Sequence, residues 1–375
     1  MNNNILIITR NLPPLIGGME RLNWHIADEL SKQNKVTIIS HSAAKKLAPK
    51  NVKFYGAPLS PLPLFLILSF IRAFWICITQ PIDTLFAGSG LTAPIVVIMA
   101  KVFRKKSIIY IHGLDIDNNS LIYRNLWIPL IRKANKIIVN STPTRELCIK
   151  KHIKAEKISI IHPGVTYPPS PPNLDSIRKL KEKFNLHEKK VLISIGRLTE
   201  RKGLSEFIEQ CFNKIISECP NTVLLIVGDT ATQALNKNMQ TPDQLIELAK
   251  KNRTDKNIIF TGKVSDLELS SLLYLSDIHV FPVKHIPCDP EGFGMVAIEA
   301  AAHGTPTVAF STGGVIDAIS NEKSGYLVTP NDYQKLSDTI IKILNSNYEW
   351  KNSCYTFAEK FAWSSFGQSI NQELN

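Results

Sequence analysis

The sequence predicts an α/β protein built from two parallel-sheet domains. Its 375 residues, of which 44% are apolar, exceed the size at which a single core normally keeps growing. Short runs rich in β-branched residues alternate with longer helical patterns, which is typical of parallel sheets with crossover helices. A proline-rich segment then divides these runs into two series.

Each series supplies its own candidate strands. In the first half they are 4–9, 35–40, 83–87, 107–111, 136–140 and 158–161. In the second half they are 190–195, 222–227, 257–260, 278–281, 306–309 and 325–328. Both series favour a doubly wound sheet, in which ligands bind at the carboxyl ends of the strands.

The segment 162–175 separates the two series. It contains five prolines, which can continue neither a helical nor a strand pattern and make a stiff connector. We interpret it as the linker between an N-terminal domain, 1–165, and a C-terminal domain, 166–355, that face each other across a ligand crevice. The alternative is a surface loop within one domain.

The segment 61–81 is apolar over nearly the length of a membrane span, which is about 20 residues. Three prolines bracket it, and the charge of Arg72 near its middle is heavily disfavoured inside a bilayer. We therefore reject a spanning helix. Two interpretations stay open: a buried helix of the first domain, which we favour, or an interfacial helix with its apolar face in a bilayer.

Charge is unevenly divided along the chain. Residues 1–165 hold 22 Lys and Arg against 8 Asp and Glu, a net of +14, whereas residues 166–375 hold 22 against 24, a net of −2. A basic first half indicates an anionic partner, either a lipid surface or an acidic acceptor. No helix-turn-helix, zinc-finger spacing or RNA-binding strand is evident, so nucleic acid is disfavoured.

The cysteines and the N-terminus favour a cytoplasmic protein. The six cysteines form no C-x-x-C pair and no zinc-ligand spacing with histidine. The chain enters an apolar strand at Ile5 without a basic region and a cleavage site before it, so a secretory signal is not expected.

The stretch EGFGMVAIE at 291–299 is the most informative in the chain. Glu291 and Glu299 bracket a Gly-Phe-Gly turn that leads into an apolar helix. A helix start offers unpaired N–H groups to a phosphate, and glycine allows close backbone approach. A carboxylate can accept hydrogen bonds from a vicinal diol. Together they suit a nucleotide sugar, although an acid near a helix start and an unrelated glutamate would also explain the pattern.

Six motifs in order resemble the retaining glycosyltransferases of family 4, which have the GT-B fold of two Rossmann-like domains. They are PPLIGGME at 13–20, IHGLD at 111–115, HPGV at 162–165, GRLTERKG at 196–203, EGFGMVAIEAAAHGTPTVA at 291–309 and STGG at 311–314. The arrangement is most similar to phosphatidylinositol mannosyltransferases and to mannosyl- and glucosyltransferases of lipopolysaccharide or capsule. The resemblance also implies that a terminal helix, 356–375, packs back on the first domain.

The resemblance assigns the donor site to the second domain. Arg197 and Lys202 would bind the diphosphate, with Arg201 a solvated neighbour. Glu291 would contact the sugar and Glu299 the ribose, with Asp289 only ordering the loop. The residues that would lend backbone groups to phosphate, sugar and base are Phe293, Gly294, Met295, Gly262 and Lys263.

In the first domain the resemblance singles out Gly17, Gly18 and His112. The glycine pair opens a helix expected from Met19 to Leu30 and would face the donor diphosphate and the acceptor. His112 follows a strand and would contact the acceptor or the donor sugar; a histidine there could equally be structural. No metal site is apparent, and we expect the cations to replace a divalent ion.

We therefore expect a metal-independent retaining hexosyltransferase with His112, Arg197, Lys202 and Glu291 as its catalytic residues. It would use a UDP- or GDP-hexose as substrate without a separate cofactor, and a membrane-held glycolipid or polysaccharide intermediate as acceptor. We expect it to be cytoplasmic and peripheral on the inner face of the cell membrane. The alternatives are a nucleotide-sugar 2-epimerase, which needs no acceptor, and a non-catalytic membrane-surface module.

Overall fold

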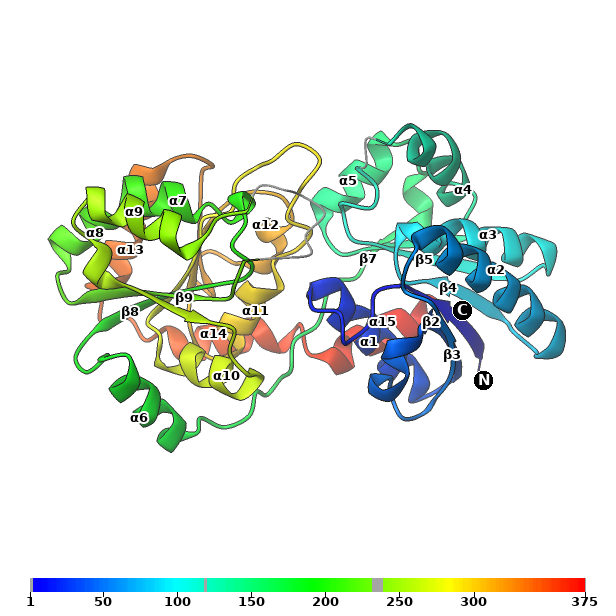
Figure 1. Ribbon diagram of the computed structural model, residues 1–375, viewed down its shortest axis with the longest axis horizontal. Helices are drawn as coiled ribbons and strands as arrows, with labels where there is room; N and C mark the ends of the chain where they lie inside the picture. The colour runs from blue at the N-terminus through cyan, green and yellow to red at the C-terminus, as the bar shows by residue number, and fades with distance from the viewer. Residues whose placement is uncertain (1–2, 118–119, 231–238, 375) are drawn as a thin grey trace. The chain divides into compact units, whose positions relative to one another are not determined.

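The computed structural model describes residues 3–117, 120–230 and 239–374, and the chain forms two compact units (Figure 1). Unit 1 consists of Met1–Gly164 and Trp363–Asn375, and unit 2 of Val165–Ala362. The first crossing between them falls inside the proline-rich segment, where residues 161–173 contain no named helix or strand.

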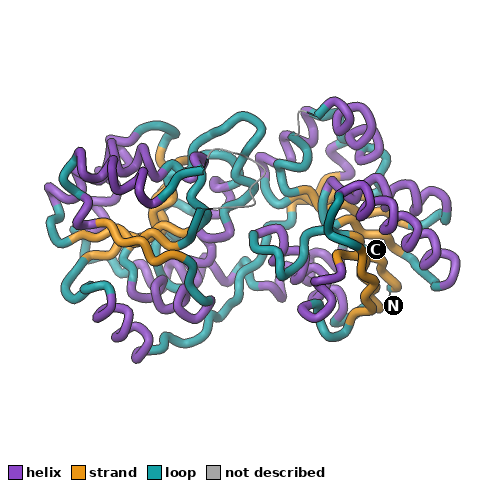
Figure 2. Tube along the Cα trace, viewed as in Figure 1, coloured by secondary structure: helices purple, strands orange, loops and turns teal. Residues whose placement is uncertain are grey.

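Unit 1 contains a seven-stranded parallel sheet in the order β3-β2-β1-β4-β5-β6-β7. Its strands, orange in Figure 2, are β1 (Asn4–Ile8), β2 (Lys35–His41), β3 (Val52–Ala57), β4 (Thr84–Ala87), β5 (Lys106–Ile111), β6 (Lys136–Val139) and β7 (Ile158–Ile160). The helices are α1 (Gly18–Ser31), α2 (Leu62–Thr79), α3 (Ala93–Val102), α4 (Ile128–Ile131), α5 (Thr142–Lys150) and α15 (Trp363–Gln372). Helices α2, α3 and α4 pack together on one face of the sheet, and α1 and α15 on the other (Figure 1).

Unit 2 contains a six-stranded parallel sheet in the order β10-β9-β8-β11-β12-β13. Its strands are β8 (Lys190–Ile195), β9 (Thr222–Val227), β10 (Ile258–Gly262), β11 (Ile278–Phe281), β12 (Thr307–Phe310) and β13 (Gly325–Val328). Its helices are α6 (Leu174–Lys183), α7 (Leu204–Phe207), α8 (Asn213–Glu218), α9 (Pro242–Lys251), α10 (Asp266–Leu275), α11 (Met295–Ala302), α12 (Val315–Ala318), α13 (Tyr333–Leu344) and α14 (Trp350–Glu359). Buried aliphatic and aromatic side chains fill both sides of this sheet.

All of the expected strands are present, each within two residues of its expected ends, and β3 is an additional strand. It lies at the edge of its sheet and pairs only with β2. Most of its residues are half-buried. An edge strand needs no continuous apolar run, which explains why the sequence pattern did not reveal it.

Each sheet has one point where the chain reverses its direction of winding. It lies between β1 and β4 in unit 1 and between β8 and β11 in unit 2. The loops that follow these two strands diverge to opposite faces, so they leave a crevice at the carboxyl edge where ligands bind in open α/β sheets. The segments after β8 and β11 contain GRLTERKG and EGFG, respectively.

Helix α2 corrects our preferred interpretation of segment 61–81. Only Phe65, Ser69, Ala73 and Ile76 of this helix are buried. By length and composition α2 could cross a membrane, but it packs against α3, β2 and β3 along its buried stripe. Most of the rest of its apolar surface is exposed, because the stripe covers only one side of a helix that is apolar nearly all round.

The terminal helix expected over 356–375 is instead two helices. Helix α14 ends at Glu359 within unit 2, and α15 begins at Trp363 within unit 1. In unit 1 the indole ring of Trp363 stacks on the imidazole of His25, with centroids 3.7 Å apart and planes 10° from parallel. The end of the chain is therefore part of the core of unit 1.

Candidate active site

A largely buried ion-pair cluster lies at the switch point of unit 2. The Lys202 ammonium, after β8, lies 3.0 Å from the Glu291 carboxylate, after β11. The Arg201 guanidinium contacts the same carboxylate oxygen, and its Nε lies 3.4 Å from Asp289. The Lys202 and Glu291 side chains are each 14% exposed, and Arg201 is 13% exposed. The fold thus joins residues 89 positions apart in the chain.

Arg201 is the clearest correction to the sequence prediction. We expected a solvated neighbour of the diphosphate pair, but Arg201 is a largely buried cation of the cluster. Asp289 also has a specific partner in Arg201, beyond ordering its own loop. The sequence offered one signal for this pairing: two acids at 289 and 291 opposite two adjacent cations at 201 and 202.

Pairing compensates only part of the cost of burying the cluster, because burial lowers the pKa of the Lys202 ammonium despite the charge of Glu291. Burial would raise the pKa of the Glu291 carboxyl, but the charges of Lys202 and Arg201 outweigh burial and lower it to about 2. The same pairing raises the pKa of Arg201, against the effect of burial. Glu291 is therefore ionised at neutral pH, and it holds two cations that would otherwise be costly to bury.

Lys202 is fixed by more than its ion pair. Its ammonium lies 4.5 Å from the centre of the Phe281 ring, at the end of β11. Its side chain also packs on Gly196, where a Cβ would lie 3.1 Å from the Lys202 Cε. Gly196 has φ +144°, which an L side chain rarely adopts. The loop after β8 therefore positions this one amine closely.

The other residues expected to bind the donor in unit 2 lie at the same edge of the sheet. Arg197 follows β8 and is exposed. Gly262 ends β10 with φ +66°, and its carbonyl accepts a hydrogen bond from Gly228 N–H at 3.0 Å, which ties the end of β10 to the loop after β9. Lys263 is exposed beside it. The structure leaves these groups at the surface, where a ligand could meet them.

Helix α11 begins as the sequence motif predicts. Gly294 is its N-cap, in the left-handed conformation at φ 87° and without a side-chain cap, and Met295 is the first helical residue. Phe293 is buried. Glu299 lies one turn inside the helix and is only 8% exposed. The helix start therefore retains backbone N–H groups suited to an anion, with an acid on each side.

The STGG loop holds the EGFG loop in place by direct backbone contact. Gly314 N–H donates a hydrogen bond of 2.8 Å to the Glu291 carbonyl. A Cβ at Gly314 would lie 1.9 Å from the Gly292 carbonyl oxygen, and one at Gly313 would lie 2.6 Å from that of Glu291. Both glycines are thus required by close approach of the two backbones.

Replacing Gly314 with alanine should displace Glu291 and weaken ligand binding at this site. Gly314 has φ −69°, which alanine adopts freely, so the effect comes from the clash alone. We expect a loss of stability of about 1–3 kcal/mol from overpacking. Calorimetric unfolding and nucleotide titration would measure it, with Ile316→Ala in α12 as the control. A variant as stable as the wild type, with unchanged nucleotide affinity, would contradict this role for the loop.

The residues expected to bind ligand in unit 1 lie at the carboxyl edge of its sheet. Gly17 is the N-cap of α1 and makes no side-chain capping hydrogen bond, and Gly18 is the first helical residue. His112 follows β5 and is 7% exposed. Its Nε2 lies 2.8 Å from the Gly88 carbonyl, which follows β4. That contact requires a proton on Nε2, so a neutral His112 has Nδ1 as its acceptor.

Asp115 organises the loop around His112. One carboxylate oxygen accepts from the His112 N–H at 2.8 Å and from the Gly113 N–H at 3.1 Å. The other accepts from the Gly90 N–H at 2.8 Å. The sequence motif placed Asp115 near His112 but could not show that it joins the loops after β4 and β5.

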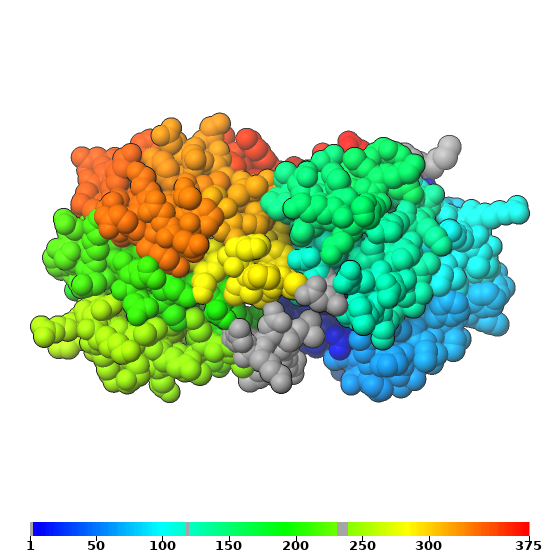
Figure 3. All heavy atoms as spheres, turned by 90° about the horizontal axis from the view of Figure 1, so that it is seen from above, coloured from blue at the N-terminus to red at the C-terminus, as the bar shows by residue number. Residues whose placement is uncertain are grey.

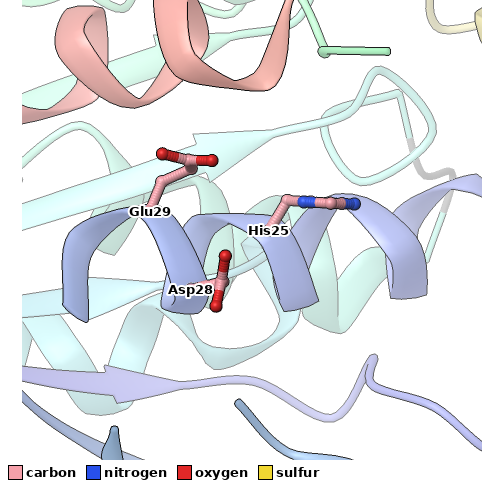
Figure 4. Close-up of side chains that lie close together, drawn as sticks. All are labelled: His25, Asp28 and Glu29. Carbon is pink, nitrogen blue, oxygen red and sulfur yellow. The ribbon is translucent and has the colours of Figure 1, made fainter. Parts of the chain in front are cut away.

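Within the described residues, one group of possible metal ligands is close together: His25, Asp28 and Glu29, all on α1 (Figure 4). The Lys32 ammonium lies 2.6 Å from Glu29 and 3.8 Å from Asp28, so the acids already have a cation. Burial lowers the pKa of His25 to about 3, which keeps the ring neutral where it stacks on Trp363. This group therefore serves the packing of α15 on α1.

Two family models match the chain. The model described as "Glycosyl transferases group 1" matches residues 176–361, and "Glycosyltransferase Family 4" matches residues 16–167. The first model includes the switch point of unit 2, and the second includes β4 but begins after β1. The chain belongs to glycosyltransferase family 4.

Relatives of similar sequence agree with this assignment. An uncharacterized glycosyltransferase of Methanocaldococcus jannaschii is 26% identical over 68% of this chain and 63% of its own. The capsular polysaccharide biosynthesis glycosyltransferase CapM of Staphylococcus aureus is 30% identical over 44% of this chain and 40% of its own. The chain thus spans less than two thirds of these relatives' lengths.

The GT-B fold of this family 4 glycosyltransferase is shown by its structural neighbours. Anabaena HepE, solved with UDP, superimposes with a TM-score of 0.78 over 100% of this chain and 99% of its own, at 21% identity. WaaG, a glycosyltransferase of lipopolysaccharide biosynthesis, gives 0.67 over 99% of both chains at 15% identity. The expected GT-B architecture is confirmed.

Proposed function

We propose that this glycosyltransferase moves a hexose from a UDP- or GDP-sugar to a membrane-held glycolipid or surface-polysaccharide intermediate, with retention of configuration and without a metal ion. The observation that carries the proposal is the cluster of Lys202, Arg201 and Glu291 at the switch point of unit 2, beside the uncapped start of α11. The UDP bound by Anabaena HepE supports a nucleotide-sugar donor.

The donor end of the reaction follows from these charges. The bond between the sugar C1 and the phosphate oxygen breaks, and its electron pair passes to that oxygen. Negative charge develops on that oxygen in the transition state. Lys202 and the exposed Arg197 would therefore stabilise the transition state more strongly than the ground state. Fixed cations and the α11 start would thereby replace a divalent ion.

The acceptor end of the reaction needs a base for one proton. In the route that we propose, the acceptor hydroxyl attacks C1 from the face that the phosphate leaves, and its proton passes to the departing phosphate oxygen. The new C1–O bond then has the original configuration. Glu291, held ionised by Lys202 and Arg201, would orient the sugar hydroxyls rather than act as the nucleophile.

The acceptor and the location are inferred from unit 1. Its residues carry the excess of positive charge, and α2 exposes a largely apolar surface. An apolar helix with basic surroundings suits the interface of an anionic leaflet. We therefore place the enzyme on the cytoplasmic face of a membrane, where lipid-linked intermediates are available.

Ligand binding and product analysis test the proposal together. The protein should be unfolded by heat in the presence of UDP, GDP, ADP and their hexose derivatives. The unfolding temperature should rise with the ligands of one base, because a ligand stabilises the folded protein by mass action. The stabilising nucleotide sugar, radiolabelled and incubated with a membrane lipid extract, should label a lipid product equally with and without EDTA. NMR of the product would give its anomeric configuration.

Other products would contradict the proposal. Conversion of the nucleotide sugar without any acceptor would indicate a 2-epimerase, and no nucleotide binding at all would indicate a non-catalytic module. Loss of transfer in EDTA, restored by a divalent ion, would overturn metal independence alone.

A further inference from the structure

We propose that an apolar groove beside α2 in unit 1 holds the hydrocarbon chain of the lipid acceptor. This inference rests on the proposed function. The groove has a volume of about 270 Å³ and is lined by eight apolar side chains. They come from α2, from the turn before α3 and the start of α3, and from Trp127, just before α4; examples are Ile67, Ile71, Leu91 and Ile95.

The chemistry of the groove selects a hydrocarbon ligand. Every lining residue is aliphatic, aromatic or proline. The one polar side-chain group among them, the Trp127 indole N–H, donates to the Leu91 carbonyl at 3.0 Å. The ring therefore contributes apolar surface, and a ligand would be held by removal of its methylenes from water.

The surface around the groove is also apolar. Five large apolar residues of α2 outside the lining are at least 40% exposed: Leu62, Leu64, Phe74, Trp75 and Ile78. Leu121, Ile122 and Leu126, in the segment that leads to Trp127, are more than half exposed. Figure 3 shows α2, in mid-blue, at the surface of its unit. An apolar patch of this extent is typical of an interaction surface.

The segment that carries the groove has an excess of positive charge. Residues 62–133 contain eight cations against the three acids Asp83, Asp115 and Asp117. The cations are Arg72, Lys101, Arg104, Lys105, Lys106, Arg124, Arg132 and Lys133. A basic segment that also carries an apolar groove suits the headgroups and chains of an acidic leaflet. We therefore commit to a membrane lipid as the occupant.

Hydrogen bonds connect the groove to the His112 loop. Leu91, in its wall, directly follows Gly90, whose N–H donates to Asp115, and the same carboxylate accepts from the His112 N–H. Tyr123, four residues before Trp127, donates from its hydroxyl to the Asp115 carbonyl. A chain in the groove would therefore bring its headgroup to the edge of the sheet that carries His112.

Monomeric lysophosphatidylglycerols of increasing chain length test the groove without a bilayer. Used below their micellar concentrations, they should bind the full-length protein with an affinity that rises roughly fourfold for each added methylene until the groove is filled. Brominated chains should quench the fluorescence of Trp127, and Trp127→Phe should remove that part of the quenching. Affinity that is independent of chain length would overturn the proposal.

Two isoleucines on α2 provide a matched pair of variants. Ile67 lines the groove and is 57% exposed, whereas Ile78 lies outside the lining and is 56% exposed. Ile67→Glu should lower lysolipid affinity at least tenfold, and Ile78→Glu should change it less than twofold. Both add the same charge, so only the groove distinguishes them. Ile71→Trp, which fills the groove without a charge, should also abolish chain binding.

Further measurements separate this inference from the proposed function. Equal lysolipid binding by the Ile67 and Ile78 variants, or an Ile67-dependent dimer that excludes lysolipid, would overturn the groove. Nucleotide-induced thermal stabilisation should be the same in all of these variants. A wild-type protein that binds nucleotide but no lysolipid would contradict the groove alone. A wild-type protein that binds lysolipid but no nucleotide would contradict the proposed function alone. Vesicles of acidic lipid should bind both variants more weakly than wild type, because both alter the α2 surface.

Discussion

Lys202→Ala should lower kcat/KM for the nucleotide sugar roughly 10- to 150-fold, since a charge-assisted hydrogen bond is worth about 1.5–3 kcal/mol. Lys202 is buried against Glu291 at the switch point, where the leaving phosphate gains charge in the proposed reaction. Steady-state transfer and nucleotide titration would measure the loss. Lys214→Ala, which breaks an ion pair with Asp338 on the surface of unit 2, is the control and should change neither.

The variant Arg201→Ala separates a ligand contact from a positioning role. Arg201 contacts Glu291 and Asp289, so we expect it to act through Glu291. Without the Arg201 guanidinium, the Glu291 carboxylate should be held less firmly. We expect Arg201→Ala to lower kcat more than nucleotide affinity, and Arg201→Lys to retain part of the activity. Unchanged donor kinetics in both Lys202→Ala and Arg201→Ala would refute the assignment of this cluster to the donor.

Deleting residues 363–375 should unfold unit 1 while unit 2 still binds nucleotide. The deletion removes the buried side chains of Trp363, Phe366, Ile370 and Leu374. Each truncation of a large core residue costs about 2–5 kcal/mol, and a domain has only about 5–15 kcal/mol of stability in total. The His25 imidazole would also lose its stacking partner.

Hydrogen exchange on the full-length and shortened chains would test the deletion. Protection should be lost throughout β1–β7 and retained in β8–β13. The single variant Trp363→Ala serves as a graded control: it should destabilise unit 1 by about 3–5 kcal/mol without unfolding it completely. Loss of protection confined to residues 176–350 would show that α15 does not support unit 1.

Much of the secondary structure was determined by the sequence locally. Apolar runs predicted the buried strands because a strand covered on both faces must be continuously apolar. Glycines marked the starts of α1 and α11, since Gly17 and Gly294 occupy N-cap positions without a side-chain cap. The motifs also placed Lys202 and Glu291 on loops at the carboxyl edge of one sheet. These features depend on a few neighbouring residues, and a sequence displays such information directly.

The tertiary structure alone decided which groups meet. The local sequence does not distinguish the environments of Arg197 and Arg201. Arg197 is exposed, whereas Arg201 is largely buried because it contacts the acids that follow β11. The apolar helix α2 became a surface because the sheet and α3 cover a single stripe of it. Likewise, β3 forms only when β2 offers an edge, and the chain breaks between α14 and α15 because α15 packs on α1. Such outcomes depend on contacts between residues distant in the chain, and local periodicity contains no information about them.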